Sequence, residues 1–168
     1  NKPGGRDICA AAMGRPMLTV RSRRVREARA LRRRATRAKR GQFLAEGPQA
    51  VREAITRPEL LVEVFATPDA AERNADLLAA SSGPVHVADD DSLAGLSETV
   101  TPQGLVAVCR LLTVPLAEGL GPTPRLVAVL VDARDPGNAG TVIRCADATG
   151  ADTVILAVPD DVLAGLVR

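Results

Sequence analysis

The sequence predicts an α/β protein organised in two parts, and three observations lead to this prediction. Apolar, strand-like runs alternate with helical segments between residues 41 and 112, as in sheets that pack against helices. Residues 113–124, TVPLAEGLGPTP, hold three prolines and two glycines and are typical of a linker. Residues 126–156 then follow the order strand, loop, helix, strand, which is a βαβ unit.

The first part is expected to consist of short elements separated by turn residues. Pro48 stands in the expected first turn of one helix, where its missing N–H costs no hydrogen bond. The predicted strands lie at 42–45, 60–66, 85–88 and 105–111, and the predicted helices at 48–55, 70–80 and 93–97.

The βαβ unit is predicted from a change of period along the chain. Residues 126–131 are apolar and rich in valine, as expected for a strand that is buried on both faces. From Ala139 the apolar residues fall on one helical face, and Gly150 is placed to end that helix. Residues 153–158 are again apolar and β-branched. Polar residues therefore gather after the first strand, where open α/β sheets bind ligands.

The loop after this first strand carries the candidate chemistry. It lacks both the G-x-G-x-x-G spacing of a dinucleotide site and the Lys-Ser/Thr pair of a phosphate loop. Instead, Asn138 can cap the helix and Gly140 allows another backbone or a ligand to approach closely. Arg144 lies about 600° after Asn138, equivalent to about 240°, so the loop must fold back if the two are to meet. Alternatively, Asn138 is only a cap and Arg144 only a solvated or salt-bridged side chain.

Charge is divided unevenly along the chain. Residues 1–42 hold 14 Lys plus Arg and 2 Asp plus Glu, a net +12, whereas the remainder carries 8 and 18, a net −10. Residues 21–40, the basic arm, have one narrow apolar line at helical spacing: Val25, Ala28, Leu31, Ala35 and Ala38. We expect a helix that docks weakly and leaves its arginines in solvent, where they attract nucleic acid. A solvated arm without a specific partner is the alternative.

Three segments of the chain resemble one known family. The string DPGNAGTVIRCADATGADTVIL, from Asp135, is similar to the first motif of the SpoU/TrmH family of RNA 2′-O-ribose methyltransferases. FLAEGPQAVREAI at 43–55 resembles the opening of that family's RNA-recognition domain, which is similar to ribosomal-protein RNA-binding domains. TPQGLVAVC at 101–109 resembles the closing strand of the same domain. The segments occur in the family's order and cover most of residues 20–156.

The resemblance implies a fold and an activity. It implies a small RNA-recognition domain followed by the first part of a SPOUT, or trefoil-knot, methyltransferase domain. The implied reaction transfers a methyl group from S-adenosylmethionine to a ribose 2′-hydroxyl, and the implied substrate is ribosomal RNA. The intact enzyme is expected to be a homodimer.

The resemblance also assigns site residues. Arg144 matches the catalytic arginine, and Asn138 is expected to position Arg144 and the ribose, with Gly140 at a close approach. Arg134 borders this site and Glu46 either faces RNA or caps the next helix. The residues of the basic arm expected to contact RNA are Arg21, Arg23, Arg24, Arg33, Arg34, Arg37, Lys39 and Arg40.

The chain departs from the family after Val158, where the sequence reads PDDVLAGLVR and none of the later family motifs follows. We therefore expect residues 125–168 to be an incomplete methyltransferase domain that lacks the cofactor motifs, so that this chain is inactive alone. Two alternatives remain open: a non-enzymatic RNA-binding module, and a nucleotide-binding α/β protein that uses the loop at 132–140.

The remaining features limit the class of protein. Residues 1–20 are expected to be disordered, and the first twelve of them resemble a tag more than a native segment. Three cysteines without C-x-x-C spacing indicate a reducing compartment, so we expect a cytoplasmic protein without a metal site. No apolar run approaches the length of a membrane span.

Overall fold

The computed structural model describes residues 16–99 and 101–157. The chain divides into two compact units, Asn1–Leu111 and Leu112–Arg168. Among the described residues, no helix has the length and apolar character needed to cross a membrane. Each unit is considered by itself below.

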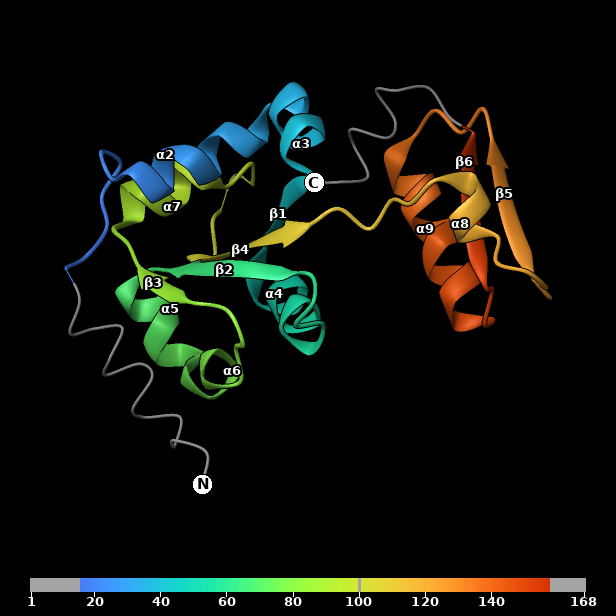
Figure 1. The fold of residues 1–168 in the computed structure, drawn as a ribbon. Coiled ribbons are helices and arrows are strands. Elements are labelled where there is room, and N and C mark those ends of the chain that lie inside the picture. Colours follow the sequence, from blue (N-terminus) through green and yellow to red (C-terminus); the bar gives the residue numbers. More distant parts are fainter. Residues whose placement is uncertain (1–15, 100, 158–168) are drawn as a thin grey trace. The chain divides into compact units, whose positions relative to one another are not determined.

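A four-stranded sheet forms the centre of the first unit (Figure 1). Its strands, in spatial order, are β1 (Gln42–Glu46), β4 (Leu105–Arg110), β2 (Leu61–Ala66) and β3 (Val85–Val87). Strand β4 pairs antiparallel with β1 and with β2, whereas β3 is parallel to β2. Because β4 is central, five of its six residues are buried and its sequence is a continuous apolar run.

Helices cover both faces of this sheet. One face carries α4 (Gly47–Thr56), α5 (Pro68–Arg73) and α6 (Ala75–Ala79). The other carries α2 (Arg23–Arg29), the 3₁₀ helix η1 (Ala30–Arg32), α3 (Arg34–Arg40) and α7 (Asp90–Leu96).

Strand β4 supplies alternate residues to two apolar clusters, since successive side chains of a strand point to opposite faces. Leu105, Ala107 and Cys109 join the cluster under α4 to α6. Val106 and Val108 join the cluster under α2, η1 and α7.

The basic arm docks firmly, which corrects the expectation of weak docking. Val25 and Leu31 are each only 1% exposed and pack with Phe65 of the sheet. The narrow apolar line suffices because its first three residues, Val25, Ala28 and Leu31, face a continuous apolar sheet surface. The expected single helix is interrupted at Arg33, whose backbone is extended (φ −87°, ψ 125°), and Ala35 beyond the break is exposed.

Three further differences from the sequence prediction concern local structure. The helix expected over 70–80 is two short helices that meet at Asn74. The expected linker contains a short helix, α8 (Leu116–Gly119). Disorder was expected for residues 1–20, but Leu18 forms a parallel bridge with Ala88; residues 1–15 lie outside the described part of the chain.

The second unit contains the expected βαβ arrangement. Strands β5 (Val127–Val131) and β6 (Thr153–Ala157) are parallel and are connected through α9 (Pro136–Ala148). Gly150 follows the helix with φ +72°, a left-handed conformation that ends helices, as the sequence predicts.

Only one face of this two-stranded sheet is covered by described residues. Leu130 and Ala139 are buried between β5 and α9. Val129 and Val131, on the opposite side of β5, are 55% and 72% exposed. Parallel sheets normally have both faces covered, whereas the described residues of this unit cover only the face under α9.

Removing an apolar side chain from the arm tests whether it is part of the first unit's core. We expect Leu31→Ala to lower the free energy of unfolding by about 2–5 kcal/mol, because it leaves a cavity against the sheet. Leu112→Ala, at a side chain that is 61% exposed, should cost less than about 0.5 kcal/mol. Urea unfolding of both variants measures the difference. Equal unfolding midpoints would mean that the arm does not dock.

Candidate functional site

Helix α9 begins directly after the loop that carries the candidate chemistry. Asp135 is its N-cap residue: the backbone is extended, and the carboxylate accepts a hydrogen bond from the N–H of Asn138 at 2.7 Å. The prediction that Asn138 caps the helix is therefore wrong. Asn138 lies within the first turn, and its side chain is exposed. A residue three positions before it does the capping, which leaves the Asn138 amide available to a ligand.

Arg144 lies on the same helix but has a different partner from the one expected. Its Nη2 donates to Thr141 Oγ1 at 3.1 Å, and Thr141 Oγ1 in turn donates to the carbonyl oxygen of Gly137 at 2.9 Å. No hydrogen bond joins Arg144 to Asn138 in the part of the chain that the structure describes. The structure thus does not support positioning of Arg144 by Asn138, and Thr141, which the sequence prediction omits, holds the guanidinium instead.

The turn out of β5 has an unusual backbone. Asp132 has φ +51°, a left-handed conformation that non-glycine residues rarely adopt and that is often found at functional sites. Its carboxylate pairs with Arg134 at 3.2 Å, and both side chains are well exposed (61% and 81%). Such a surface pair contributes little to stability, so Arg134 can exchange it for another anion.

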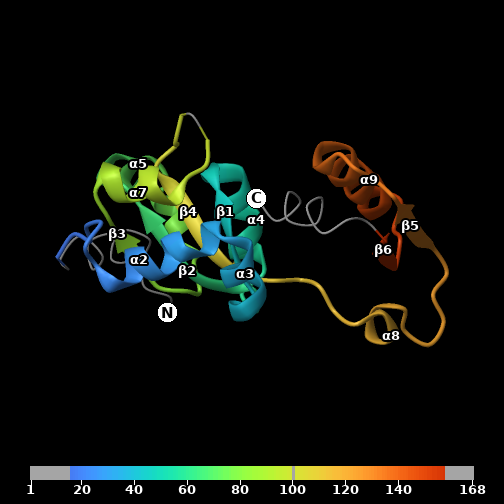
Figure 2. The same ribbon diagram turned by 90° about the horizontal axis from the view of Figure 1, so that it is seen from above.

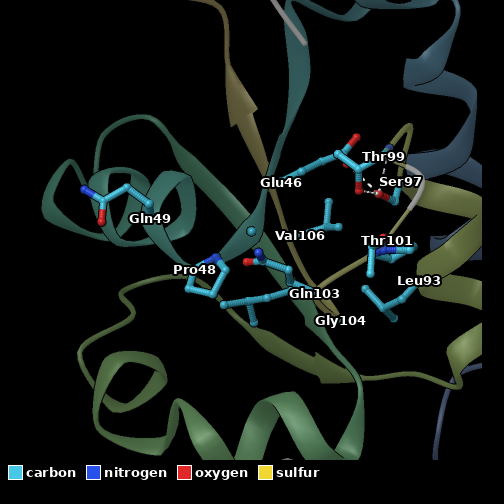
Figure 3. A pocket seen from close by; sticks show the side chains of 13 residues that line it. Glu46, Pro48, Gln49, Leu93, Ser97, Thr99, Thr101, Gln103, Gly104 and Val106 are labelled. Atoms are coloured by element: carbon cyan, nitrogen blue, oxygen red, sulfur yellow. Dashed lines mark hydrogen bonds between the residues drawn. The ribbon is translucent and has the colours of Figure 1, made fainter.

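A pocket of about 290 Å³ lies at the carboxyl end of β1 (Figure 3). Figure 3 shows Glu46 and the residues after α7 meeting at its edge. The Glu46 carboxylate accepts hydrogen bonds from Ser97 Oγ at 2.5 Å and from the N–H of Glu98 at 2.9 Å. Glu46 occupies the N-cap position of α4, as one of the two interpretations expected, but its side chain makes no capping hydrogen bond there. It anchors the segment that forms the pocket wall.

Two glycines allow the walls of this pocket to come together. Gly47 has φ +84°, and a Cβ built there would lie 3.2 Å from Gln103 Oε1. Gly104 has φ +69°, and a Cβ there would lie 2.5 Å from Thr67 Oγ1, closer than real Cβ contacts. Most of the pocket lining comes from segments 43–55 and 101–109, the two that carry the resemblance in this unit. Its polar side chains are Glu46, Gln49, Ser97, Thr99, Thr101 and Gln103.

Several arginines of the basic arm make hydrogen bonds or ion pairs within the first unit. Arg23 pairs with Glu27 at 2.8 Å, and Arg40 donates to the carbonyl oxygen of Glu27 at 3.2 Å. Arg37 is only 7% exposed and donates to the carbonyl oxygens of Leu31 and Arg32 at 3.2 and 2.9 Å. The expectation that Arg37 is a solvent-exposed RNA contact is therefore wrong, since it stabilises the turn at the end of η1.

Most basic side chains of the arm lie at the surface. Arg21, Arg33, Arg34 and Lys39 are exposed, as predicted. The sequence prediction omits Arg26, Arg29 and Arg32, which are also exposed. The spacing contained part of the signal, because Arg26 and Arg29 lie three residues apart and share one face of α2.

One ion pair joins the arm to the sheet. Glu63 Oε2 on β2 accepts a hydrogen bond from Arg24 Nη1 at 3.1 Å and lies 3.1 Å from Nε2 of the buried His86. Burial raises the pKa of Glu63, but the neighbouring His86 and then Arg24 outweigh it, so the pKa lies below its ordinary value of 4.5. Arg24 is therefore a structural contact in this unit.

Comparison with known proteins identifies the family. Residues 22–107 match the family model described as the MRM3-like substrate binding domain, which includes the basic arm. The chain is 33% identical over 138 residues to the 23S rRNA (guanosine(2553)-2'-O)-methyltransferase RlmP of Bacillus subtilis (strain 168). The chain belongs to the SpoU family of RNA methyltransferases. The match covers 82% of this chain and 52% of RlmP, and the chain spans about half the length of the curated relatives it matches.

Solved SpoU structures share the fold. The AdoMet-bound rRNA methyltransferase from Sinorhizobium meliloti matches with a TM-score of 0.66 and 28% identity, over 89% of this chain and 59% of that one. The SpoU methyltransferase AviRb from Streptomyces viridochromogenes, in complex with AdoMet, matches with a TM-score of 0.67 and 26% identity, over 88% and 58%. The first unit thus matches the substrate-binding domain of this family, and the structural matches extend into the second unit.

The Arg24 contact can be tested through the pKa of Glu63. Arg24→Gln removes one of the interactions that lower this pKa, so the pKa should rise toward 4.5. Because the folded-state pKa is depressed, the stability from this ion pair is present above pH 4.5 and is lost as the pH falls through the folded pKa. The variant should lose part of that pH dependence. Carbon-13 NMR titration of the Glu63 carboxyl measures the shift. Arg23→Gln is the matched control, and an equal shift there would contradict the assignment.

Proposed function

We propose that the full-length protein transfers a methyl group from S-adenosylmethionine to a ribose 2′-hydroxyl in ribosomal RNA. The observation that carries the proposal is the placement of Asn138, Gly140 and Arg144 on one helix, α9, which follows a parallel strand. The carboxyl end of such a strand is where open α/β sheets bind ligands. The activities of RlmP and of the Sinorhizobium meliloti rRNA methyltransferase support this reaction and this substrate class.

The proposed roles follow from the chemistry of each side chain. Arg144 is a poor base because its guanidinium stays protonated, so it orients the 2′-hydroxyl and an adjacent phosphate through N–H donors. The hydroxyl proton then passes to phosphate or water. Asn138, with its amide exposed at the helix start, positions the substrate ribose. Gly140 allows close approach, and Arg134 supplies a further contact to RNA.

Thr141 adds a positioning role that only the geometry suggests. It bonds to the Arg144 guanidinium from one turn earlier and is itself bonded to the backbone at Gly137. This chain of hydrogen bonds holds the arginine in one orientation while it leaves the other guanidinium N–H groups for a ligand.

The described residues do not by themselves fit S-adenosylmethionine. A cofactor pocket buries most of its ligand, whereas Arg134, Asp135, Asn138 and Arg144 are all exposed. We therefore place cofactor binding, and the subunit contacts of a homodimer, on residues outside those described. The chemistry that the cofactor would supply is an electrophilic methyl group on sulfur.

A non-enzymatic RNA-binding module is the second candidate function. The first unit favours it, because that unit has its own core, a polar pocket and an exposed basic surface. Tight RNA binding by the full-length protein without methyl transfer would select this alternative.

Replacement of Arg144 tests the catalytic proposal in the full-length protein. We expect Arg144→Ala to lower methyl transfer to ribosomal RNA at least about 100-fold, since an orienting and charge-stabilising donor is lost. RNA affinity should stay within about twofold of the parent protein, because the arm and the pocket are unchanged. Asp147→Asn, at an exposed carboxylate on the same helix, is the control. Methylation by Arg144→Ala at the parent rate would refute the assignment.

Cofactor binding by the 168-residue chain is a separate test. The described residues at the start of α9 are exposed and do not surround a cavity that would bury a ligand. Calorimetric titration with S-adenosylmethionine should therefore give no binding heat. Saturable one-site binding would show instead that this chain contains a complete cofactor pocket.

A further inference from the structure

We infer that the outer surface of the basic arm contains a phosphate-binding hollow for RNA, formed by Arg26, Arg29 and Arg33. This inference rests on the proposed function only in taking RNA as the polyanion. Of these three arginines, only Arg33 is among the RNA contacts expected from the sequence.

The hollow has a defined wall. It has a volume of about 560 Å³ and is lined by Arg26, Arg29, Ala30, Arg32, Arg33 and Glu98. Helix α2 supplies Arg26 and Arg29. The extended backbone of Arg33, between η1 and α3, places the third arginine in the same hollow. Figure 2 shows α2 and α3 lying across one face of the sheet. Arg26, Arg29 and Arg33 are exposed, whereas Val25, Ala28 and Leu31 are buried against that face.

These arginines have no partner within the described chain. Arg26, Arg29 and Arg33 make no side-chain hydrogen bond or ion pair with another described residue, whereas Arg23, Arg24, Arg37 and Arg40 all do. Like charges three and four residues apart repel one another. The C-terminal end of the α2 dipole offsets part of this repulsion at Arg26 and Arg29. Bound phosphate would remove the rest, because guanidinium forks match phosphate oxygens.

The arm presents these side chains in a fixed arrangement. Val25, Ala28 and Leu31 are buried against the sheet, and the buried Arg37 ties the end of η1 through two carbonyl oxygens. A docked helix loses little backbone entropy when it binds a ligand, in contrast to a flexible basic tail. The hollow is therefore a preorganised site.

Glu98 links the hollow to the pocket beside Glu46. Its Oε1 lies 3.7 Å from Arg32 Nε, and its backbone N–H donates to Glu46. Its neighbours Ser97 and Thr99 line the pocket. The hollow and the pocket thus lie on two sides of one short segment, so an RNA strand held by phosphate in the hollow passes near the polar side chains of the pocket. The Glu98 carboxylate competes with phosphate for Arg32.

The test compares two double variants of the 168-residue chain. Arg26→Gln/Arg29→Gln removes two charges from the hollow, and Arg57→Gln/Arg73→Gln removes two exposed charges from helices on the opposite face of the sheet. Fluorescence anisotropy with labelled polyuridylate, repeated over a salt titration, gives the affinity and its salt dependence. We expect the hollow variant to bind about tenfold more weakly, with a salt slope smaller by about 1.4 because two single-strand phosphate contacts are lost. The control should bind as the parent chain does.

Glu98→Gln should change the RNA affinity in the opposite direction from the arginine variant. Removing the competing carboxylate should tighten polyuridylate binding about two- to threefold, because Arg32 becomes available. Since phosphate contacts carry no sequence information, polyadenylate should show the same pattern.

The outcomes separate this inference from the proposed function. Equal affinity and salt slope for the two double variants would overturn the hollow as a phosphate site, and so would a parent chain that binds neither RNA. Methyl transfer by the full-length protein is assayed independently through Arg144→Ala. If the protein methylates RNA but replacement of Arg26 and Arg29 changes nothing, only the phosphate-binding hollow is refuted. If the salt slopes are as expected but no methyl group is transferred, only the proposed activity is refuted.

Discussion

Burial of strand β4 on both faces is the constraint on which the rest of the first unit depends. Its alternate side chains enter two apolar clusters, so both helical layers pack against the same five buried residues. The layer under α4 to α6 positions the start of α4 and the pocket beside it. The layer under α2 and α7 fixes the arm. A substitution in β4 would therefore disturb the pocket and the basic surface together, although they lie in different parts of the sequence.

The sequence predicted most elements because their signals are local. The valine-rich run of β5, the period change at α9 and the left-handed Gly150 all depend on neighbouring residues. Asp135 was missed as the cap although its signal was local too: it stands directly before a proline and three residues before Asn138. The helix that carries Asn138, Gly140 and Arg144 was predicted for the same reason.

Other features could not be predicted from local pattern. The partner of Glu46 is Ser97, more than fifty residues later, and only the folded sheet brings the two together. The burial of Arg37 depends on the interruption of the helix at Arg33. This interruption directs the carbonyl oxygens of Leu31 and Arg32 toward the Arg37 guanidinium. Arginine content alone predicted a solvated arm. Few side chains dock the arm. They stabilise it because they are buried against a continuous apolar face of the sheet.

The two surfaces of the first unit divide the work of recognition in a physically reasonable way. Phosphate contacts attract RNA without regard to sequence, while hydrogen bonds to base edges distinguish nucleotides. The arm supplies charge without aromatic side chains, so it can hold a backbone but cannot stack bases. Apart from the Glu46 carboxylate, the pocket supplies amides and hydroxyls, which suit base edges. Glu98 stands between the two surfaces: its backbone N–H donates to Glu46 beside the pocket, and its carboxylate pairs with Arg32 at the hollow.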